Sequence, residues 1–97
     1  MKYLKTFENT GQYNIGDYVV CVEPSYPEII NYVGVIVDYD GYNNYVQYDY
    51  DKLPDYMKMG FRTYGGLGIR PYPDREIVRK LPDEEADLLR NQNKFNL

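Results

Sequence analysis

Two short apolar runs constrain what this chain can fold into. Tyr18–Val22 reads YVVCV and Val33–Tyr39 reads VGVIVDY, and both are rich in β-branched residues, which favour strands. A strand with one wet face alternates apolar and polar residues, but both faces of these runs are apolar. We therefore predict two strands that are each buried on both faces, covered by another part of the chain or by a second protomer.

A third strand is predicted after a turn. Asp40-Gly41 is a strong turn signal, and we expect it to open a loop of about five residues. The following run, Tyr45–Tyr50, alternates cleanly, with Val46 and Tyr48 on the face opposite Gln47. This strand is therefore predicted to have one buried and one wet face.

Shorter elements are predicted in the second half of the chain. Residues 51–60 have an irregular pattern, and Phe61–Tyr64 and Leu67–Arg70 are expected as short strands around Gly65-Gly66. Pro71 is expected to end the second of them, because proline cannot donate a hydrogen bond to a strand ladder.

The last residues predict a helix. Ile77 and Val78 indicate a final short strand or 3₁₀ turn, and Asp83 is a good N-cap for a helix with acidic first turns. The whole pattern predicts one mainly β domain, a small β-barrel of about five strands with a short C-terminal α-helix. Its predicted parts are an N-terminal arm over residues 1–15, the barrel over 16–80, and the helix and tail over 81–97.

The composition argues against catalysis. The chain has no histidine, and its one cysteine, Cys21, lies in an apolar run without a base to activate it. A lone cysteine fits a reducing compartment. No run approaches the ~20 apolar residues of a membrane span, and the N-terminus lacks the apolar stretch of a signal peptide. We expect a non-catalytic protein without cofactor, metal or membrane association.

The opening hairpin resembles that of small SH3-like barrels. Gly16-Asp17-Tyr18-Val19 followed by Gly34-Val35-Ile36 is similar to the KOW motif of ribosome- and transcription-associated proteins, over about residues 16–50. The resemblance implies an SH3-like barrel and a nucleic-acid contact module. The loop Glu23–Glu28 departs from the KOW pattern because it is acidic, whereas KOW domains carry basic residues there.

The two ends of the chain carry a second resemblance. Met1–Asn9, Gly16–Val19 and Asn93–Leu97 look like a group of small uncharacterised proteins from tailed bacteriophages and other large DNA viruses. In that group a segment resembling Glu76-Ile77 leads into an acidic last helix like Asp83–Leu89. The resemblance implies a viral protein made in the host cytoplasm. Small phage proteins without catalytic sites often bind host factors or block host defence.

The first candidate site is an anion site in the basic middle of the chain. Residues 52–80 carry seven basic and three acidic groups, although the whole chain has a net charge of −4. Arginines bind phosphate with paired hydrogen bonds, glycines let backbone N–H groups approach an anion, and tyrosines stack on bases. A nucleotide or cyclic-nucleotide signal is therefore one candidate ligand. The residues are Arg62, Tyr64, Gly65, Gly66, Arg70 and Tyr72.

The second candidate site is an acidic, tyrosine-bearing surface. Residues 1–51 carry eight acidic and two basic groups, which favours a basic partner. Tyrosine is a common anchor of protein interfaces. The predicted protein-binding residues are Asp38, Asp40, Tyr42, Tyr45 and Asp49, with Asp51 beside them.

Three functions remain open from the sequence. The first is a viral binding protein that antagonises a host factor or defence system by protein contact. The second is sequestration of a nucleotide signal, and the third is a KOW-like nucleic-acid contact. A homodimer is a further possibility, because the apolar surface of the first two strands exceeds what a single small core needs.

Overall fold

The chain folds around one five-stranded antiparallel sheet. The structure, a computed structural model, describes residues 12–62 and 66–95. The strand order is β4-β3-β2-β1-β5, so the last strand returns beside the first. The edge strands β4 and β5 do not pair with each other, and the sheet is open. The strands are β1 (Tyr18–Cys21), β2 (Gly34–Tyr39), β3 (Asn44–Gln47), β4 (Ile69–Tyr72) and β5 (Ile77–Lys80).

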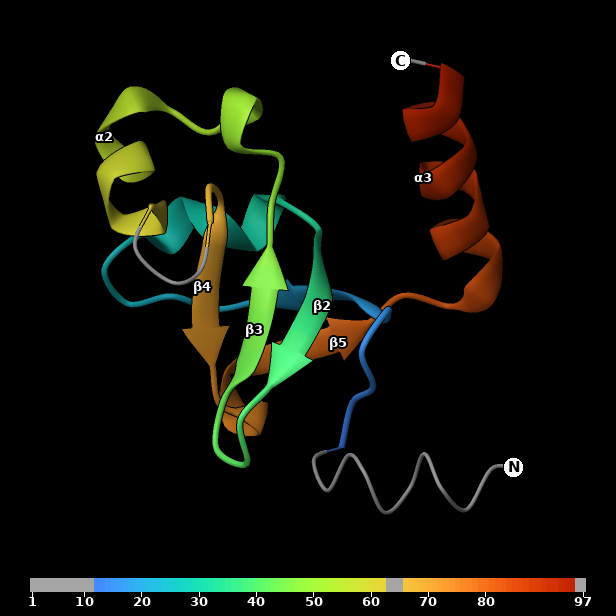
Figure 1. The fold of residues 1–97 in the computed structure, drawn as a ribbon, viewed down its shortest axis with the longest axis horizontal. Coiled ribbons are helices and arrows are strands. Elements are labelled where there is room, and N and C mark those ends of the chain that lie inside the picture. The colour runs from blue at the N-terminus through green and yellow to red at the C-terminus, as the bar shows by residue number, and fades with distance from the viewer. Residues whose placement is uncertain (1–11, 63–65, 96–97) are drawn as a thin grey trace.

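Short helices connect the strands. Most of them and the loops around them gather at one end of the sheet, above β3 and β4 in Figure 1. The prediction of a mainly β fold with a C-terminal helix is confirmed. The helical elements are η1 (Pro27–Asn31), η2 (Tyr50–Lys52), α2 (Asp55–Lys58), η3 (Met59–Phe61), η4 (Asp74–Glu76) and α3 (Asp83–Phe95).

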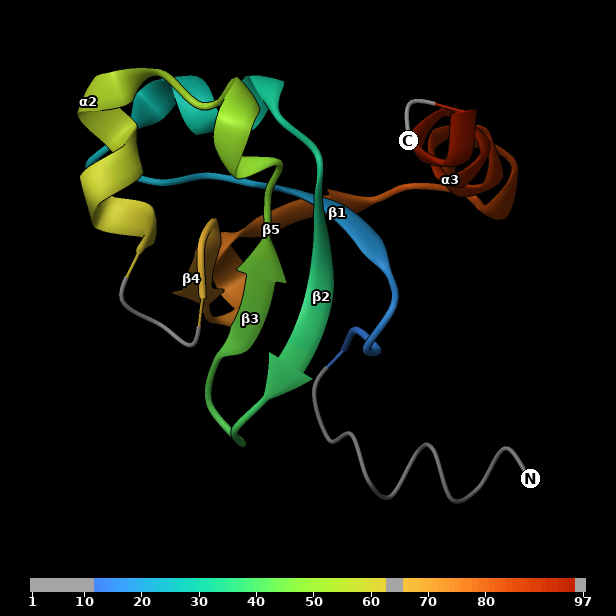
Figure 2. The ribbon, with the colours of Figure 1, turned by 45° about the horizontal axis from the view of Figure 1, so that its top comes forward.

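All five strands contribute to the core. β2, β3 and β4 run side by side, and β1 and β5 run across them (Figures 1 and 2). The apolar side chains meet between these two groups of strands, and the helical end adds Ile29, Met57 and Phe61. The strand residues in the core cluster are Val19, Cys21, Ile36, Val46, Tyr72 and Ile77.

Burial on both faces is confirmed only at the centre of β1, since Tyr18 is partly exposed and Val22 is 41% exposed, and it is wrong for β2. In β1, Val19 and Cys21 lie in the core and Val20, on the other face, is also buried. In β2, Ile36 is buried but Val37 is exposed, so this strand alternates in the ordinary way. Gly34 lies so close to Val46 and Tyr48 that a Cβ there would overlap them, which explains the glycine.

Two predictions for the second half of the chain are wrong. Phe61 ends the 3₁₀ helix η3 instead of beginning a strand, and residues 63–65 lie outside the described residues. Pro71 does not end a strand but lies inside β4, opposite Tyr45. β4 is an edge strand, where the missing N–H of a proline costs no ladder hydrogen bond on the open side.

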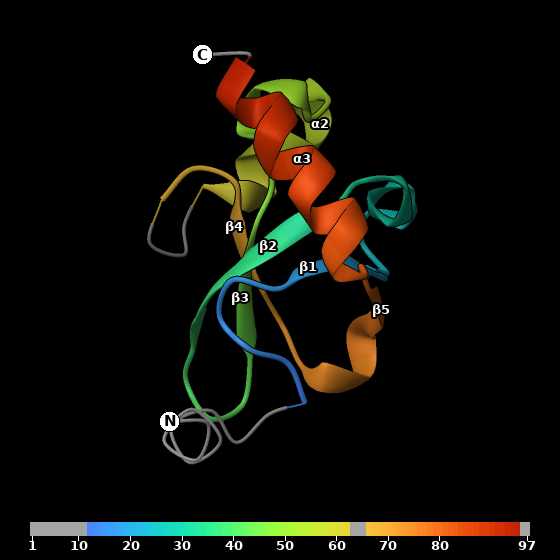
Figure 3. The same cartoon turned by 90° about the vertical axis from the view of Figure 1, so that its right-hand side faces the viewer.

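The predicted C-terminal helix is present as α3. It follows β5, lies to one side of the sheet in Figure 1 and faces the viewer in Figure 3. Leu81 and Ala86 are buried, so the beginning of α3 packs against the body, whereas Leu88 is exposed. Among the described residues no helix is both long and apolar enough to cross a membrane. Most of the predicted N-terminal arm, residues 1–11, lies outside the described residues.

Candidate functional site

The turn between β2 and β3 is held by one carboxylate. Asp40 Oδ1 accepts hydrogen bonds from the backbone N–H groups of Tyr42, at 2.9 Å, and of Asn43, at 2.7 Å. Gly41, which lies between Asp40 and Tyr42, has a φ of +97°, a conformation that strongly favours glycine. Asp-Gly at these positions therefore builds the turn that the sequence predicts.

Two tyrosine hydroxyls fix the same turn from its flanks. The Tyr45 hydroxyl donates to Asp40 Oδ2 at 2.7 Å, and the Tyr39 hydroxyl donates to the carbonyl oxygen of Gly41 at 3.2 Å. The N–H of Asn43, the Tyr45 hydroxyl and the N–H of Tyr42 together hold the pKa of Asp40 below its ordinary value. The turn thus keeps a charged carboxylate in a fixed position at its base.

Four of the five predicted protein-binding residues lie together on this turn. Asp38 and Tyr45 are direct cross-strand partners. Asp38 precedes the turn that carries Asp40 and Tyr42, and Tyr45 follows it. Tyr42 is 84% exposed, the largest exposed fraction among the large apolar and aromatic residues of the described chain. We call these four residues and their turn the hairpin tip. It presents one highly exposed tyrosine and two exposed aspartates.

Asp49 does not belong to the hairpin tip. It lies beyond the opposite end of β3, just before η2, and its carboxylate is 3.9 Å from Lys52 Nζ. Both side chains are largely exposed, so this pair contributes little to stability. The predicted acidic surface is therefore two separate places, with Asp49 and Asp51 away from the other carboxylates.

Arg70, predicted to bind an anion, forms an ion pair and a hydrogen bond within the fold. Its Nε donates to Glu23 Oε1 at 2.8 Å and one terminal nitrogen donates to the carbonyl oxygen of Gly60 at 2.7 Å. The guanidinium also lies 5.4 Å from the ring centre of Tyr26 and 5.5 Å from that of Phe61. Glu23 is 7% exposed, so this is a largely buried ion pair that ties β4 to the loop after β1.

The rest of the predicted anion site is dispersed. Tyr72 is fully buried in the core, so its ring cannot stack on a base at the surface. Arg62 and Gly66 are exposed, and Tyr64 and Gly65 lie outside the described residues. The structure therefore does not bring the two arginines together around one open anion site.

The buried polar groups do not form a catalytic arrangement. Cys21 lies near Tyr48 in the core, and burial raises the pKa of its thiol to about 11, which keeps it protonated. Burial likewise raises the pKa values of Tyr48 and Tyr72. Among the described residues no group of three or more carboxylate, thiol or imidazole side chains is placed to hold a metal ion.

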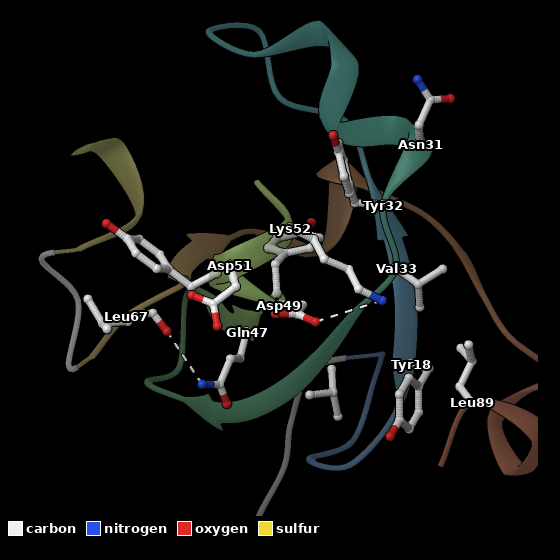
Figure 4. A pocket seen from close by; sticks show the side chains of 13 residues that line it. Tyr18, Asn31, Tyr32, Val33, Gln47, Asp49, Asp51, Lys52, Leu67 and Leu89 are labelled. Carbon is white, nitrogen blue, oxygen red and sulfur yellow. Dashed lines mark hydrogen bonds and ion pairs between the residues drawn. The ribbon is translucent and has the colours of Figure 1, made fainter. Parts of the chain in front are cut away.

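A groove that the sequence did not predict crosses the outer face of the sheet. Tyr18, Val35 and Gln47 are successive cross-strand neighbours on β1, β2 and β3, and they form its floor. Asp49 and Asp51 line one side and Leu89 of α3 lies on the other (Figure 4). The alternation of Tyr45–Tyr50 places Gln47 and Asp49 on one face, but no sequence signal brings Leu89 to them.

Comparisons of the chain with protein-family models, with curated proteins and with solved structures return no match. Function is therefore inferred from the geometry of the chain itself. Among the described residues, the hairpin tip and the outer-face groove each offer a partner both aromatic rings and charged groups.

Proposed function

We propose that this chain is a non-catalytic binding protein that acts by contact with another protein through the hairpin tip. The observation that carries the proposal is Tyr42, which is 84% exposed on a turn fixed by three hydrogen bonds to one carboxylate. A ring presented on a rigid turn loses little conformational entropy when it is buried in a partner. Tyrosine is also among the residues that contribute most to binding at protein interfaces.

The charge of the hairpin tip favours a basic partner surface. Asp38 and Asp40 are exposed and close to Tyr42 in sequence. Residues 38–45, all of which the structure describes, include no lysine or arginine. Opposite charge across an interface increases the association rate and selects against acidic partners. A basic groove, such as one that a host enzyme uses to bind nucleic acid, fits this chemistry.

The biological setting belongs to the same proposal. The resemblance of both chain ends to small proteins of tailed bacteriophages and large DNA viruses supports a viral protein that acts in the host cytoplasm. A binding protein from a virus has host factors as its available partners, and we propose antagonism of a host factor or antiviral defence.

The finer fold proposed here is an SH3-like barrel. Two features support it: β1 pairs with both β2 and β5, and the β1–β5 pair crosses the β2–β3–β4 meander to enclose one core. The KOW-like opening hairpin gives the same proposal. A nucleic-acid contact has less support, because the exposed hairpin tip is acidic and would repel phosphates.

Affinity capture with matched variants tests the proposal. Wild-type chain, Tyr42→Ala and Tyr56→Ala are each immobilised and exposed to host lysate, and bound proteins are quantified by mass spectrometry. Tyr56 is 59% exposed on α2, at the opposite end of the molecule (Figure 1), so it controls for loss of an exposed ring. We expect one host protein to be lost with Tyr42→Ala and kept with Tyr56→Ala. Equal recovery with all three would contradict the proposal.

A further inference from the structure

The outer-face groove is a second surface with the properties of a binding site. Its floor is the row Tyr18, Val35 and Gln47, which spans three strands, or about 10 Å at the usual strand spacing. Tyr18 and Val35 are only partly buried, although both lie on the sheet. The groove therefore offers apolar and aromatic surface that the fold itself leaves partly uncovered.

The charges on the groove are mainly negative. Asp49 and Asp51 line it together with one cation, Lys52. Lys52 Nζ lies 3.9 Å from the carboxylate of Asp49, and both side chains are largely exposed. An exposed pair of this kind is weak, so a cationic side chain of a ligand can take the place of Lys52. Asp51 forms no ion pair within the part of the chain that the structure describes. Two carboxylates are thus available to a positively charged ligand.

The aromatic rings of the groove suit a cation as well. Tyr18, Tyr32 and Tyr50 all line it. The chain's own Lys58 Nζ lies 5.4 Å from the ring centre of Tyr50, so one of these rings already attracts an ammonium group in the folded protein. Leu89 of α3 and Val35 provide apolar contact for the carbon chains between charged groups.

We propose that the outer-face groove binds an extended basic segment of a partner protein. Its lysine or arginine side chains pair with Asp49 and Asp51 and contact the tyrosine rings, and its apolar side chains contact Val35 and Leu89. The carboxylates exclude an acidic peptide and a nucleic acid. This inference shares with the proposed function only the idea that the chain binds a protein. The two surfaces are separate, since the groove and the hairpin tip lie at opposite ends of β3.

A synthetic peptide tests the groove without knowledge of the natural partner. The probe is a fluorescein-labelled peptide of alternating arginine and leucine, with a glutamate–leucine peptide as its acidic counterpart. Binding is measured by fluorescence anisotropy, and the contacted residues are mapped by backbone amide chemical shifts. We expect the basic peptide alone to bind, with affinity that falls as salt is raised, and with shifts at Gln47, Asp51 and Leu89.

Matched charge variants locate the interaction. Asp51→Asn removes one groove carboxylate, and Asp38→Asn removes one carboxylate of the hairpin tip. We expect the first to weaken binding of the basic peptide by about 1.4-fold to fivefold, the range of one exposed ion pair, and the second to leave it unchanged. Equal effects of the two variants, shifts confined to other surfaces, or binding of the acidic peptide would overturn the groove proposal.

Two further outcomes separate the possible explanations. If shifts at Gln47 and Leu89 appear on raising protein concentration alone and light scattering detects a dimer, a second copy occupies the groove and the basic-segment proposal is wrong. Tyr42→Ala is expected to bind the peptide like the wild type. If the basic peptide does not bind but host-protein capture still depends on Tyr42, the groove proposal is wrong and the proposed function is supported. If the peptide binds the groove but capture does not depend on Tyr42, the proposed function is wrong and the groove proposal is supported.

Discussion

The hydroxyl of Tyr45 donates a 2.7 Å hydrogen bond to Oδ2 of Asp40, and this contact joins the β3 strand to the turn that precedes it. The other oxygen of the same carboxylate accepts two backbone N–H groups. One aspartate therefore sets the shape of the whole hairpin tip. The backbone that carries the exposed Tyr42 ring depends on it for its shape.

The pKa of Asp40 should respond to loss of the Tyr45 hydroxyl. The bonds to its carboxylate lower the folded pKa, so they stabilise the hairpin above the unfolded pKa of about 3.9. That stability is lost as the pH falls through the lower, folded pKa. Tyr45→Phe should raise the folded pKa toward the ordinary value, as measured by NMR titration of the carboxyl carbon. Tyr42→Phe is the control, and an unchanged pKa in Tyr45→Phe would refute this role.

The buried pair of Glu23 and Arg70 should dominate the stability of the helical end. Glu23→Ala leaves the Arg70 guanidinium without its anion among aromatic rings, and we expect a loss of about 2–4 kcal/mol in the free energy of unfolding. Arg62→Ala, at an exposed arginine, should change it by no more than about 0.5 kcal/mol. Urea unfolding measures both. A Glu23→Ala protein as stable as Arg62→Ala would show that the pair contributes nothing.

A Cβ at position 34 should strain the sheet. Gly34→Ala places a methyl group against Val46 and Tyr48, and overpacking of this kind costs about 1–3 kcal/mol. Val46→Ala should cost less in the Gly34→Ala background than in the wild type, because it makes room for the new methyl group. Thermal or urea unfolding of the four proteins in this cycle gives the coupling. Strictly additive effects would mean that the two sites do not collide.

The Cys21 thiol should be protected from alkylation. It is fully buried and its pKa is raised to about 11, so little thiolate forms near neutral pH. We expect iodoacetamide at pH 8 to label the protein quickly in denaturant and very slowly without it, as followed by intact mass. Rapid labelling of the folded protein would show that β1 opens easily.

Local patterns predicted those elements that local forces determine. The Asp40-Gly41 turn and the alternation from Tyr45 to Asp49 are present in the structure, because each depends on residues close in sequence. The predicted strand itself ends earlier, at Gln47, and Tyr50 begins η2. Pro71 was misassigned because its place depends on strand order: only an edge strand tolerates it. The position of a strand within its sheet is not visible in a short run of sequence.

Long-range partnerships explain the differences at the candidate sites. Arg70 pairs with Glu23, 47 residues away in the sequence. The local sequence therefore indicated an arginine available to an anion, whereas its guanidinium is paired within the fold. Asp49 lies four residues beyond Tyr45, about 13 Å along an extended chain, and this distance removes it from the hairpin tip. Charge and tyrosine content predicted which residues are exposed at the tip but not how they are grouped.

The most direct measurement of the central claim is site-specific photo-crosslinking at the hairpin tip. Benzoylphenylalanine replaces Tyr42 in one variant and Tyr56 in another, and both are irradiated in host lysate. The account predicts a discrete crosslinked host protein from position 42 that is absent from position 56 and from a position-42 variant that also carries Asp40→Ala. Crosslinks of the same pattern from both positions, or none from position 42, would contradict it.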